Sequence, residues 1–296
     1  MSANARGDGL EGEARLRSAL RQTPDLRAAV VMVHGYRFCP FSDPAHSPHE
    51  HILSFTPARD CWKAVSWPRH LHVGRGGLMG ISLGWSARSS LAQSYTQAED
   101  TGAALARIAQ IVADERHGLP LHVIAHSLGA RVVLAALPLL PAGALSRLIL
   151  LSGAEYRGRA AASLDSPAGR SVRVLNVTSR ENLPFDIGFR AAIRPDKWSD
   201  LPLSAGLAAR AANWIDLRID CPRHAERLAR LGFRLRPPAT RVCHWSGYMR
   251  PGVFPLYRAL LSDRGGALFS TLRQTLAPDT AAPAARARGF GAGASA

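Results

Sequence analysis

The chain has 296 residues and a formal net charge of +15, with 37 Lys and Arg against 22 Asp and Glu. Its composition, 47% hydrophobic and 20% charged, excludes wholesale disorder and is typical of a folded protein with a sizeable core. The basic residues are nearly all arginines that occur singly, without runs or interleaved aromatic residues, so no nucleic-acid partner is expected. Peripheral contact of this basic surface with an anionic membrane stays open.

The two ends of the chain differ in pattern from the middle. Residues 1–26 are polar and Gly-rich before they become helix-like, and residues 277–296 contain Ala, Gly, Pro and Arg without an apolar period. We therefore expect an N-terminal extension and a disordered tail around one domain at 27–276. The sequence has no run with the apolar length of a signal peptide or membrane span, and its four cysteines are widely spaced, so we expect a cytoplasmic protein.

Short apolar runs alternate with longer helical patterns through the middle of the chain. This order predicts an α/β fold with a mostly parallel central sheet and helices on both faces. The predicted strands are residues 28–33, 78–85, 121–126, 147–152, 172–178 and 214–220, and the predicted helices are 98–116, 130–140 and 223–233. Residues 37–77 fit neither period and are too long for a simple connection, so we interpret them as an insertion that lies over one end of the sheet.

One predicted strand, 121–126, runs directly into a serine and then into a helix. A nucleophile on so tight a turn has a strained backbone, and the residues two positions before and after it must be small, as Ala125 and Gly129 are. The following helix points its N-terminal N–H groups at the position where oxyanion charge would develop. These features predict Ser127 as a nucleophile, with a serine that only caps the helix as the alternative.

A second turn, His34-Gly35-Tyr36, ends the strand predicted at 28–33. A glycine at this point lets the chain bend so that the next N–H faces the substrate oxygen. We therefore expect the N–H groups of Tyr36 and Leu128 to form a two-donor oxyanion hole. A buried histidine in an ordinary strand-end turn is the alternative.

Three strings resemble the α/β-hydrolase superfamily: HGY at 34–36, GWSARSSLAQSYTQAEDTGAALARI at 84–108 and LHVIAHSLGARVVLAAL at 121–137. They are most similar to an uncharacterised bacterial esterase/lipase-like branch whose nucleophile lies in an AHS[LM]G motif. The likeness covers about residues 28–190 and recurs near His244. It implies the α/β-hydrolase fold and the chain order Ser, acid, His, and it implies no particular substrate.

The predicted nucleophile needs a base, because a serine hydroxyl is a poor nucleophile at neutral pH. Only His224 and His244 follow Ser127 in the sequence. His224 belongs to a solvated helical pattern, whereas His244 lies in an apolar segment with aromatic neighbours, which favours His244 as the base.

The base in turn needs an acid that fixes its tautomer. In the loop after the strand at 172–178, Glu181 is nearest the strand end and is the first choice. Asp186 is the alternative acid, and Glu155, after the preceding strand, is a third choice. Relatives of this fold often place Asp where this chain has Asn182.

Together these residues predict a serine hydrolase that cleaves a small-molecule or lipid carboxylic ester through an acyl-enzyme. Acyl transfer by the same triad, and a non-catalytic protein whose basic surface binds anionic partners, are the alternatives. No cofactor is expected. No metal is expected either, because the residues that crowd the first loop have no standard ligand spacing; they are Cys39, His46, His49 and His51. We expect this loop to cap the active-site mouth, with Trp62, Trp67, Trp85 and Phe41 either lining a pocket or simply packing.

Overall fold

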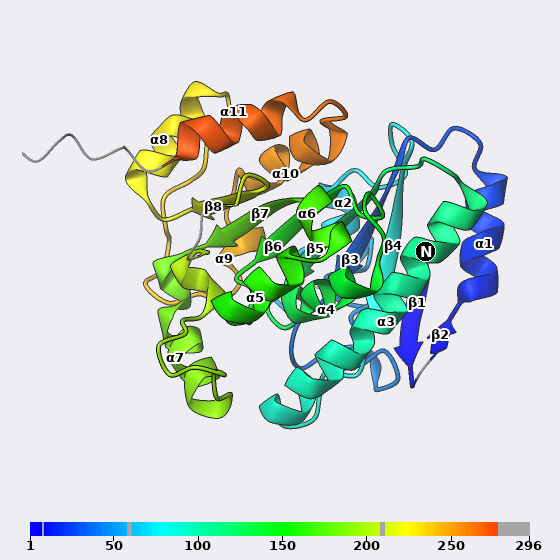
Figure 1. Ribbon diagram of the computed structural model, residues 1–296, viewed down its shortest axis with the longest axis horizontal. Coiled ribbons are helices and arrows are strands. Elements are labelled where there is room, and N and C mark those ends of the chain that lie inside the picture. The colour runs from blue at the N-terminus through cyan, green and yellow to red at the C-terminus, as the bar shows by residue number, and fades with distance from the viewer. Residues whose placement is uncertain (8, 58–60, 208–210, 278–296) are drawn as a thin grey trace, which may run out of the picture.

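An eight-stranded sheet forms the centre of the molecule (Figure 1), in a computed structural model that describes residues 1–7, 9–57, 61–207 and 211–277. The strand order is β2-β1-β4-β3-β5-β6-β7-β8, and every neighbouring pair is parallel except β1 with β2. The strands are β1 (Ser2–Arg6), β2 (Gly9–Glu11), β3 (Ala28–Val33), β4 (Leu78–Gly84), β5 (Leu121–His126), β6 (Arg147–Leu151), β7 (Arg173–Thr178) and β8 (Trp214–Arg218).

Helices cover both faces of this sheet. They are α1 (Glu13–Gln22), α2 (Trp67–His70), α3 (Leu91–Glu115), α4 (Gly129–Ala136), α5 (Arg157–Leu164), α6 (Pro167–Ser171), α7 (Leu183–Ala192), α8 (Pro222–Arg230), α9 (Ser246–Met249), α10 (Val253–Ser262) and α11 (Ala267–Leu276). Short 3-10 turns occur at Pro44–His46, Leu137–Leu139, Arg180–Asn182 and Leu203–Ala205. The parallel sheet with helices on both faces confirms the predicted α/β-hydrolase fold. Among the helices that the structure describes, none combines the length and the apolar character that crossing a bilayer requires.

Each central strand contributes to two hydrophobic cores, because successive side chains of a strand face opposite sides of the sheet. In β3, Ala29, Val31 and Val33 belong to the first core, whereas Val30 and Met32 belong to the second. A parallel sheet that is covered on both faces needs this continuous apolar sequence. The arrangement leaves the two ends of the strands, rather than the faces of the sheet, as the places where polar chemistry can gather.

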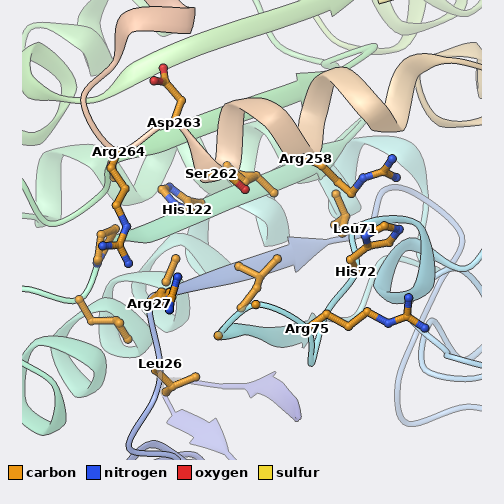
Figure 2. Close-up of a pocket in the computed structure, with 18 of the residues that line it drawn as sticks. Leu26, Arg27, Leu71, His72, Arg75, His122, Arg258, Ser262, Asp263 and Arg264 are labelled. Carbon is orange, nitrogen blue, oxygen red and sulfur yellow. The ribbon is translucent and has the colours of Figure 1, made fainter.

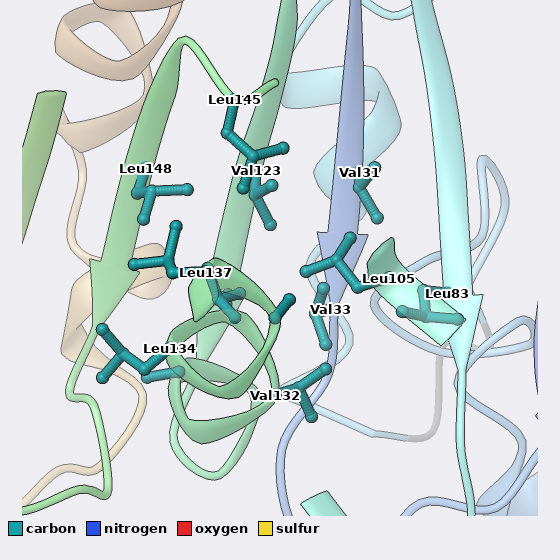
Figure 3. Packing of buried hydrophobic residues seen from close by; sticks show 14 of the residues in the cluster. Val31, Val33, Leu83, Leu105, Val123, Val132, Leu134, Leu137, Leu145 and Leu148 are labelled. Atoms are coloured by element: carbon teal, nitrogen blue, oxygen red, sulfur yellow. The ribbon is translucent and has the colours of Figure 1, made fainter. Parts of the chain in front are cut away.

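The first core packs α1, α3, α4, α5 and α6 on one face of the sheet. Figure 3 shows Val31 and Val33 of β3 beside Leu105 of α3 and Val132 of α4, all of them buried. The helix that follows the predicted nucleophile, α4, is therefore held in the same core as α3 and β3.

The segment at 37–77 is the connection between the parallel strands β3 and β4. It covers the second face of the sheet, where Ile52, Trp67 and Leu71 are buried against the β3 side chains Val30 and Met32. Along most of this segment, irregular backbone and the single turn of α2 pack against the sheet. Elsewhere in the sheet a longer helix takes this place between two parallel strands.

Residues 1–26 are not the extension that the sequence predicted. β1 pairs in parallel with β4, β2 pairs with β1, and Leu16 and Leu20 of α1 are fully buried in the first core. The prediction was wrong because β1 is a short strand whose inward side chains are only Ala3 and Ala5, too small to mark an apolar period. Residues 278–296 of the predicted tail lie outside the described residues.

Candidate functional site

Ser127 occupies a sharp turn between the end of β5 and the start of α4. Its φ of +55° lies in the left-handed region, which is uncommon for residues other than glycine. The Ser127 N–H donates to the Leu151 carbonyl of β6 at 3.0 Å, and the Ser127 carbonyl accepts from the Ala130 N–H at 3.0 Å. Strand pairing and the first turn of the helix thus hold the strained backbone from both sides.

Two glycines allow the turn after β3 to press against this serine turn. A Cβ on Gly35 would lie 2.7 Å from the Ser127 Cβ, and a Cβ on Gly129 would lie 2.7 Å from the His34 carbonyl oxygen. Both separations are shorter than side-chain carbon atoms tolerate. The contact requires glycine at both positions, and it brings the HG turn and the serine turn together as the sequence predicted.

His34 holds the HG turn in place. The Trp85 N–H donates to His34 Nε2 at 3.0 Å, so His34 Nδ1 carries the proton and donates to the Gly35 carbonyl at 2.8 Å. The Trp85 indole N–H donates to the His34 carbonyl at 3.0 Å, and the two rings stack. Because burial lowers the pKa of His34 to about 3, this histidine is neutral at pH 7.

The two predicted oxyanion-hole residues flank Ser127 at the same edge of the sheet. Within the part of the chain that the structure describes, neither the Tyr36 N–H nor the Leu128 N–H donates to another protein group. The Tyr36 hydroxyl is used elsewhere and donates to the Ser89 carbonyl at 3.0 Å. The assignment of these two N–H groups to an oxyanion hole stays a prediction.

His244 lies beside the serine turn, held there by His126, the residue that precedes Ser127. The His126 Nε2–H donates to the His244 carbonyl at 3.0 Å, and the ring centroids are 4.6 Å apart. Phe185 stacks on the His244 ring at 4.7 Å. Burial, followed by the nearby His126 and Lys63, lowers the pKa of His244 well below its usual value. No hydrogen bond joins the Ser127 hydroxyl to His244 among the described residues, a contact that often tightens only when substrate binds.

The side chain that contacts His244 Nδ1 is Asn182, at 2.5 Å through its Oδ1. The Asn182 Nδ2–H in turn donates to Asp186 Oδ1 at 2.8 Å. Because an ionised carboxylate only accepts hydrogen bonds, Asp186 forces the amide nitrogen to its own side and the amide oxygen toward His244. An oxygen there requires a proton on His244 Nδ1, and it leaves the Nε2 lone pair free to act as a base.

Asp186, the alternative acid of the sequence analysis, is linked to His244 only through the Asn182 side chain. Burial raises its pKa to about 6, against hydrogen bonds from Ser204 and Asn182 that lower the pKa. It is therefore ionised at pH 7 and titrates in the weakly acidic range. This raised pKa makes the orientation of Asn182 sensitive to pH.

Glu181, the first choice for the acid, does not contact His244 among the described residues. Its carboxylate forms a buried ion pair with Arg250 and accepts the Ser179 hydroxyl at 2.7 Å. Its backbone carbonyl accepts the Cys243 N–H at 2.9 Å, next to the histidine. The prediction that Glu181 orients His244 therefore needs correction, because the ion pair draws the side chain away and Asn182 fills the position.

Glu155, the third choice, is also committed to a structural network. It is 2% exposed and accepts hydrogen bonds from Arg131 Nη1 at 2.6 Å, the Tyr95 hydroxyl at 2.5 Å and the Tyr156 N–H at 2.7 Å. Arg131 belongs to α4, so this ion pair fastens the helix that begins at the serine turn.

The aromatic residues predicted to line a pocket divide into two groups. Trp67 and Trp85 are fully buried in the two cores, whereas Phe41 and Trp62 are exposed. Trp62 packs edge-on against Trp245, the neighbour of His244, with ring centroids 5.5 Å apart. One part of the segment at 37–77 therefore reaches the predicted site, while most of it covers the sheet.

The cysteine and histidine residues of the first loop form separate pairs. His49 Nε2 lies 2.7 Å from the Asn4 side chain, and His51 Nε2 lies 3.0 Å from Cys61 Sγ. Among the described residues, no group of three or more His, Cys, Asp and Glu side chains is arranged to hold a metal ion.

Sequence reasoning missed His126 altogether and noticed Asn182 only as a departure from the usual Asp. The signal for Asn182 was its place in the loop after β7, where the acid is expected. His126 gave no such signal, since the residue before the nucleophile has no required identity in the motif.

The topology and the serine turn define a protein with the α/β-hydrolase fold. No protein-family model and no curated protein matches the sequence. Among solved structures, it is similar to TT1662 from Thermus thermophilus, with 14% identity over 81% of this chain and 89% of that chain and a TM-score of 0.40. It is also similar to an acetylxylan esterase (12% identity, 85% of this chain and 100% of that chain, TM-score 0.35) and to the phospholipase PlaB from Legionella pneumophila (17% identity, 56% and 43%, TM-score 0.30).

Proposed function

We propose that the protein is a serine hydrolase that cleaves carboxylic esters, with Ser127 as nucleophile, His244 as base and Asn182 in the position of the usual acid. The observation that carries the proposal is the chain of contacts from Asp186 through Asn182 to His244, which reaches the histidine beside a serine held at positive φ. In this chain Asn182 donates to Asp186 and accepts the proton of His244 Nδ1. His244 Nε2 is therefore the ring nitrogen without a proton, as a general base requires.

The proposed reaction begins when Ser127 Oγ attacks the ester carbonyl carbon and His244 Nε2 takes the hydroxyl proton. The carbonyl oxygen becomes an oxyanion, to which the N–H groups of Tyr36 and Leu128 donate. Collapse of the intermediate breaks the bond to the alcohol, and the alcohol leaves with the proton from His244. Water then repeats the sequence on the acyl-enzyme, so the products are the alcohol and the free acid.

An amide in the third position supplies orientation without a full negative charge. Amide side chains hold the imidazole in other nucleophilic enzymes, so a carboxylate is not obligatory. Here Asp186 supplies the charge from behind the amide, where it stabilises the imidazolium at longer range and keeps Asn182 from flipping. The lowered pKa of the half-buried His244 is consistent with a base that is neutral before the reaction.

The test is covalent labelling by a fluorophosphonate, which reacts with an activated serine. We expect wild-type protein to be labelled and both Ser127→Ala and His244→Ala to be unlabelled. Ser94→Ala is the matched control, because Ser94 is a fully buried serine on α3 and its loss leaves the proposed machinery intact. Wild-type protein that stays unlabelled, under conditions that label a known serine hydrolase, would contradict the proposal and favour a non-catalytic role.

The substrate class is tested separately with a panel of esters and thioesters of increasing acyl length, including lipid esters. Turnover that disappears in Ser127→Ala identifies the acyl group that the site accepts. Adding a competing alcohol to the same assay distinguishes hydrolysis from acyl transfer, since transfer yields a new ester and hydrolysis yields only the free acid.

A further inference from the structure

A cavity of about 960 Å³ opens at the edge of the sheet opposite to Ser127. It lies where strands β3, β4 and β5 begin, and residues of the α3 end and of α10 complete its wall. His122 in this cavity and Ser127 are five residues apart along β5, which corresponds to about 16 Å of extended strand. The cavity is therefore separate from the proposed active site, and its role is independent of whether Ser127 is a nucleophile.

The cavity is lined by many more basic than acidic side chains. The lining arginines are Arg27, Arg75, Arg116, Arg258 and Arg264. The lining carboxylate is Asp263, and Arg147 already pairs with it at 3.6 Å. Figure 2 shows Arg27 and Arg264 beside His122 at one end, with Arg75, Arg258 and His72 at the other.

Two of these arginines have structural tasks. Arg116 donates to the carbonyls of Thr23 and Pro24, both at 2.7 Å, and Arg258 donates to the carbonyl of His70 at 2.8 Å. These hydrogen bonds hold the walls of the cavity in place. Because backbone carbonyls carry no full negative charge, the positive charges of Arg116 and Arg258 stay uncompensated.

The other three, Arg27, Arg75 and Arg264, are exposed and form no ion pair with any described residue. Burial, then the neighbouring Arg258 and Arg75, lowers the pKa of His72, which reports the same positive field. Low-dielectric walls concentrate such a field within a concave site. A ligand that carries several negative charges would relieve it.

A second observation comes from the floor of the cavity. His122 is 4% exposed, and its Nδ1 is buried without a hydrogen-bond partner among the described residues, while its ring bonds the Leu261 backbone. Burial lowers the pKa of His122 to about 4, so the ring is neutral and Nδ1 is an unused acceptor. Buried acceptors of this kind are normally satisfied, and a hydroxyl group would satisfy this one.

We propose that this cavity binds a small organic phosphate of nucleotide size, with its phosphate oxygens on Arg27 and Arg264 and a hydroxyl group near His122. The guanidinium fork matches phosphate geometry better than it matches other common anions. The volume suits a ligand far larger than a free phosphate ion. The half-buried Leu26 and the exposed Pro255 offer the organic part an apolar surface.

The test is isothermal titration of the full chain with adenosine 5′-diphosphate and with pyrophosphate, at physiological ionic strength. We expect one saturable site for the nucleotide, with affinity at least about tenfold lower in the double variant Arg27→Ala/Arg264→Ala. Arg170→Ala is the matched control, because Arg170 is exposed on α6 and lies outside the cavity. Ser127→Ala should bind like wild type, which separates this result from the fate of the proposed hydrolase.

A second variant tests the floor. His122→Phe keeps a buried ring but removes the acceptor, so we expect it to lose the preference for the nucleotide over pyrophosphate. Three results would overturn the proposal: absence of saturable binding, equal weakening by Arg170→Ala, or binding only to anionic vesicles or oligonucleotides. The last two would assign the charge to a diffuse basic surface.

Discussion

The two edges of the sheet treat charge in opposite ways. At the edge where the strands end, His34 and His126 are buried and His244 is half-buried, and the loss of hydration lowers the pKa of each below the neutral range. At the edge where the strands begin, exposed arginines such as Arg27 and Arg264 gather around a cavity without partners among the described residues. The first edge, around His244, keeps a base uncharged, and we call it the neutral edge. The second edge, around the cavity, concentrates positive charge that water or a ligand must balance, and we call it the charged edge.

Both edges follow from the same sheet. Parallel strands bring all their ends to one side, so the loops after β3, β5 and β7 meet around Ser127. The loops before β3, β4 and β5 meet in the same way around the cavity. What differs is the packing above each edge, which is close at the first and open at the second.

Removing the amide at the neutral edge should give the largest effect. Asn182→Ala deprives His244 Nδ1 of its acceptor, so the tautomer with a free Nε2 is no longer favoured. We expect fluorophosphonate labelling to slow about 10³-fold, or about 4 kcal/mol. The rate of labelling measures the effect, and circular dichroism checks the fold.

Asn213→Ala is the control for this variant. Asn213 also bonds through its amide, to the carbonyls of Gly169 and Val172, at a distance from the site. It should lose some stability and keep the wild-type labelling rate. If Asn182→Ala is labelled as fast as wild type, the amide does not orient the base.

The close packing of the neutral edge is tested by Gly129→Ala. The new Cβ would meet the His34 carbonyl at 2.7 Å, so the strand and helix must separate, and we expect a loss of about 3 kcal/mol in the free energy of unfolding. Urea denaturation measures it. Gly188→Ala on α7 is the control, because nothing lies within 4 Å of its Cβ position and helix propensity should make it slightly stabilising. Equal stability of the two variants would show that the turns do not touch.

The strands of this sheet could be predicted closely, because burial on both faces makes them continuous apolar runs. The predicted segments 28–33 and 121–126 agree with β3 and β5. β1 escaped prediction, because its two inward residues, Ala3 and Ala5, are too small to mark an apolar period. The serine turn could be predicted because its steric demands act on near neighbours in the sequence.

The third member of the site depended on contacts that are distant in the sequence. Glu181 and Asn182 are adjacent on one 3-10 turn, and nothing local decides which of them faces His244. The partner that decides is Arg250, 69 residues further on, which draws Glu181 aside. The basic cavity was equally hidden, because its arginines come singly from separate segments.

A change at Asp186 should affect stability and activity in opposite directions. Its pKa is raised to about 6 in the folded protein, above its value in an unfolded chain, so wild type loses stability as the pH rises through 6. Asp186→Asn avoids this cost and should be about 2 kcal/mol more stable at pH 8. The gain should vanish below about pH 4, where the carboxyl is protonated in both states.

The labelling rate of Asp186→Asn should fall about tenfold at pH 8, because the imidazolium loses the nearby charge. Urea denaturation at pH 8 and pH 4 and labelling at pH 8 give the three measurements. A variant that is less stable than wild type at pH 8 would show that the buried carboxylate stabilises the fold and would contradict the sign of its pKa shift.

The charged edge should respond least. Arg75→Gln removes one positive charge from a cluster that includes Arg258, so we expect the Tm to rise by about 1 °C at low salt. In 1 M NaCl the Debye length falls to about 3 Å and the gain should disappear. Arg170→Gln, outside the cluster, should leave the Tm unchanged under both conditions. A lower Tm for Arg75→Gln would mean that Arg75 has a favourable partner, and the cavity would then lack the unbalanced charge that distinguishes it from the neutral edge.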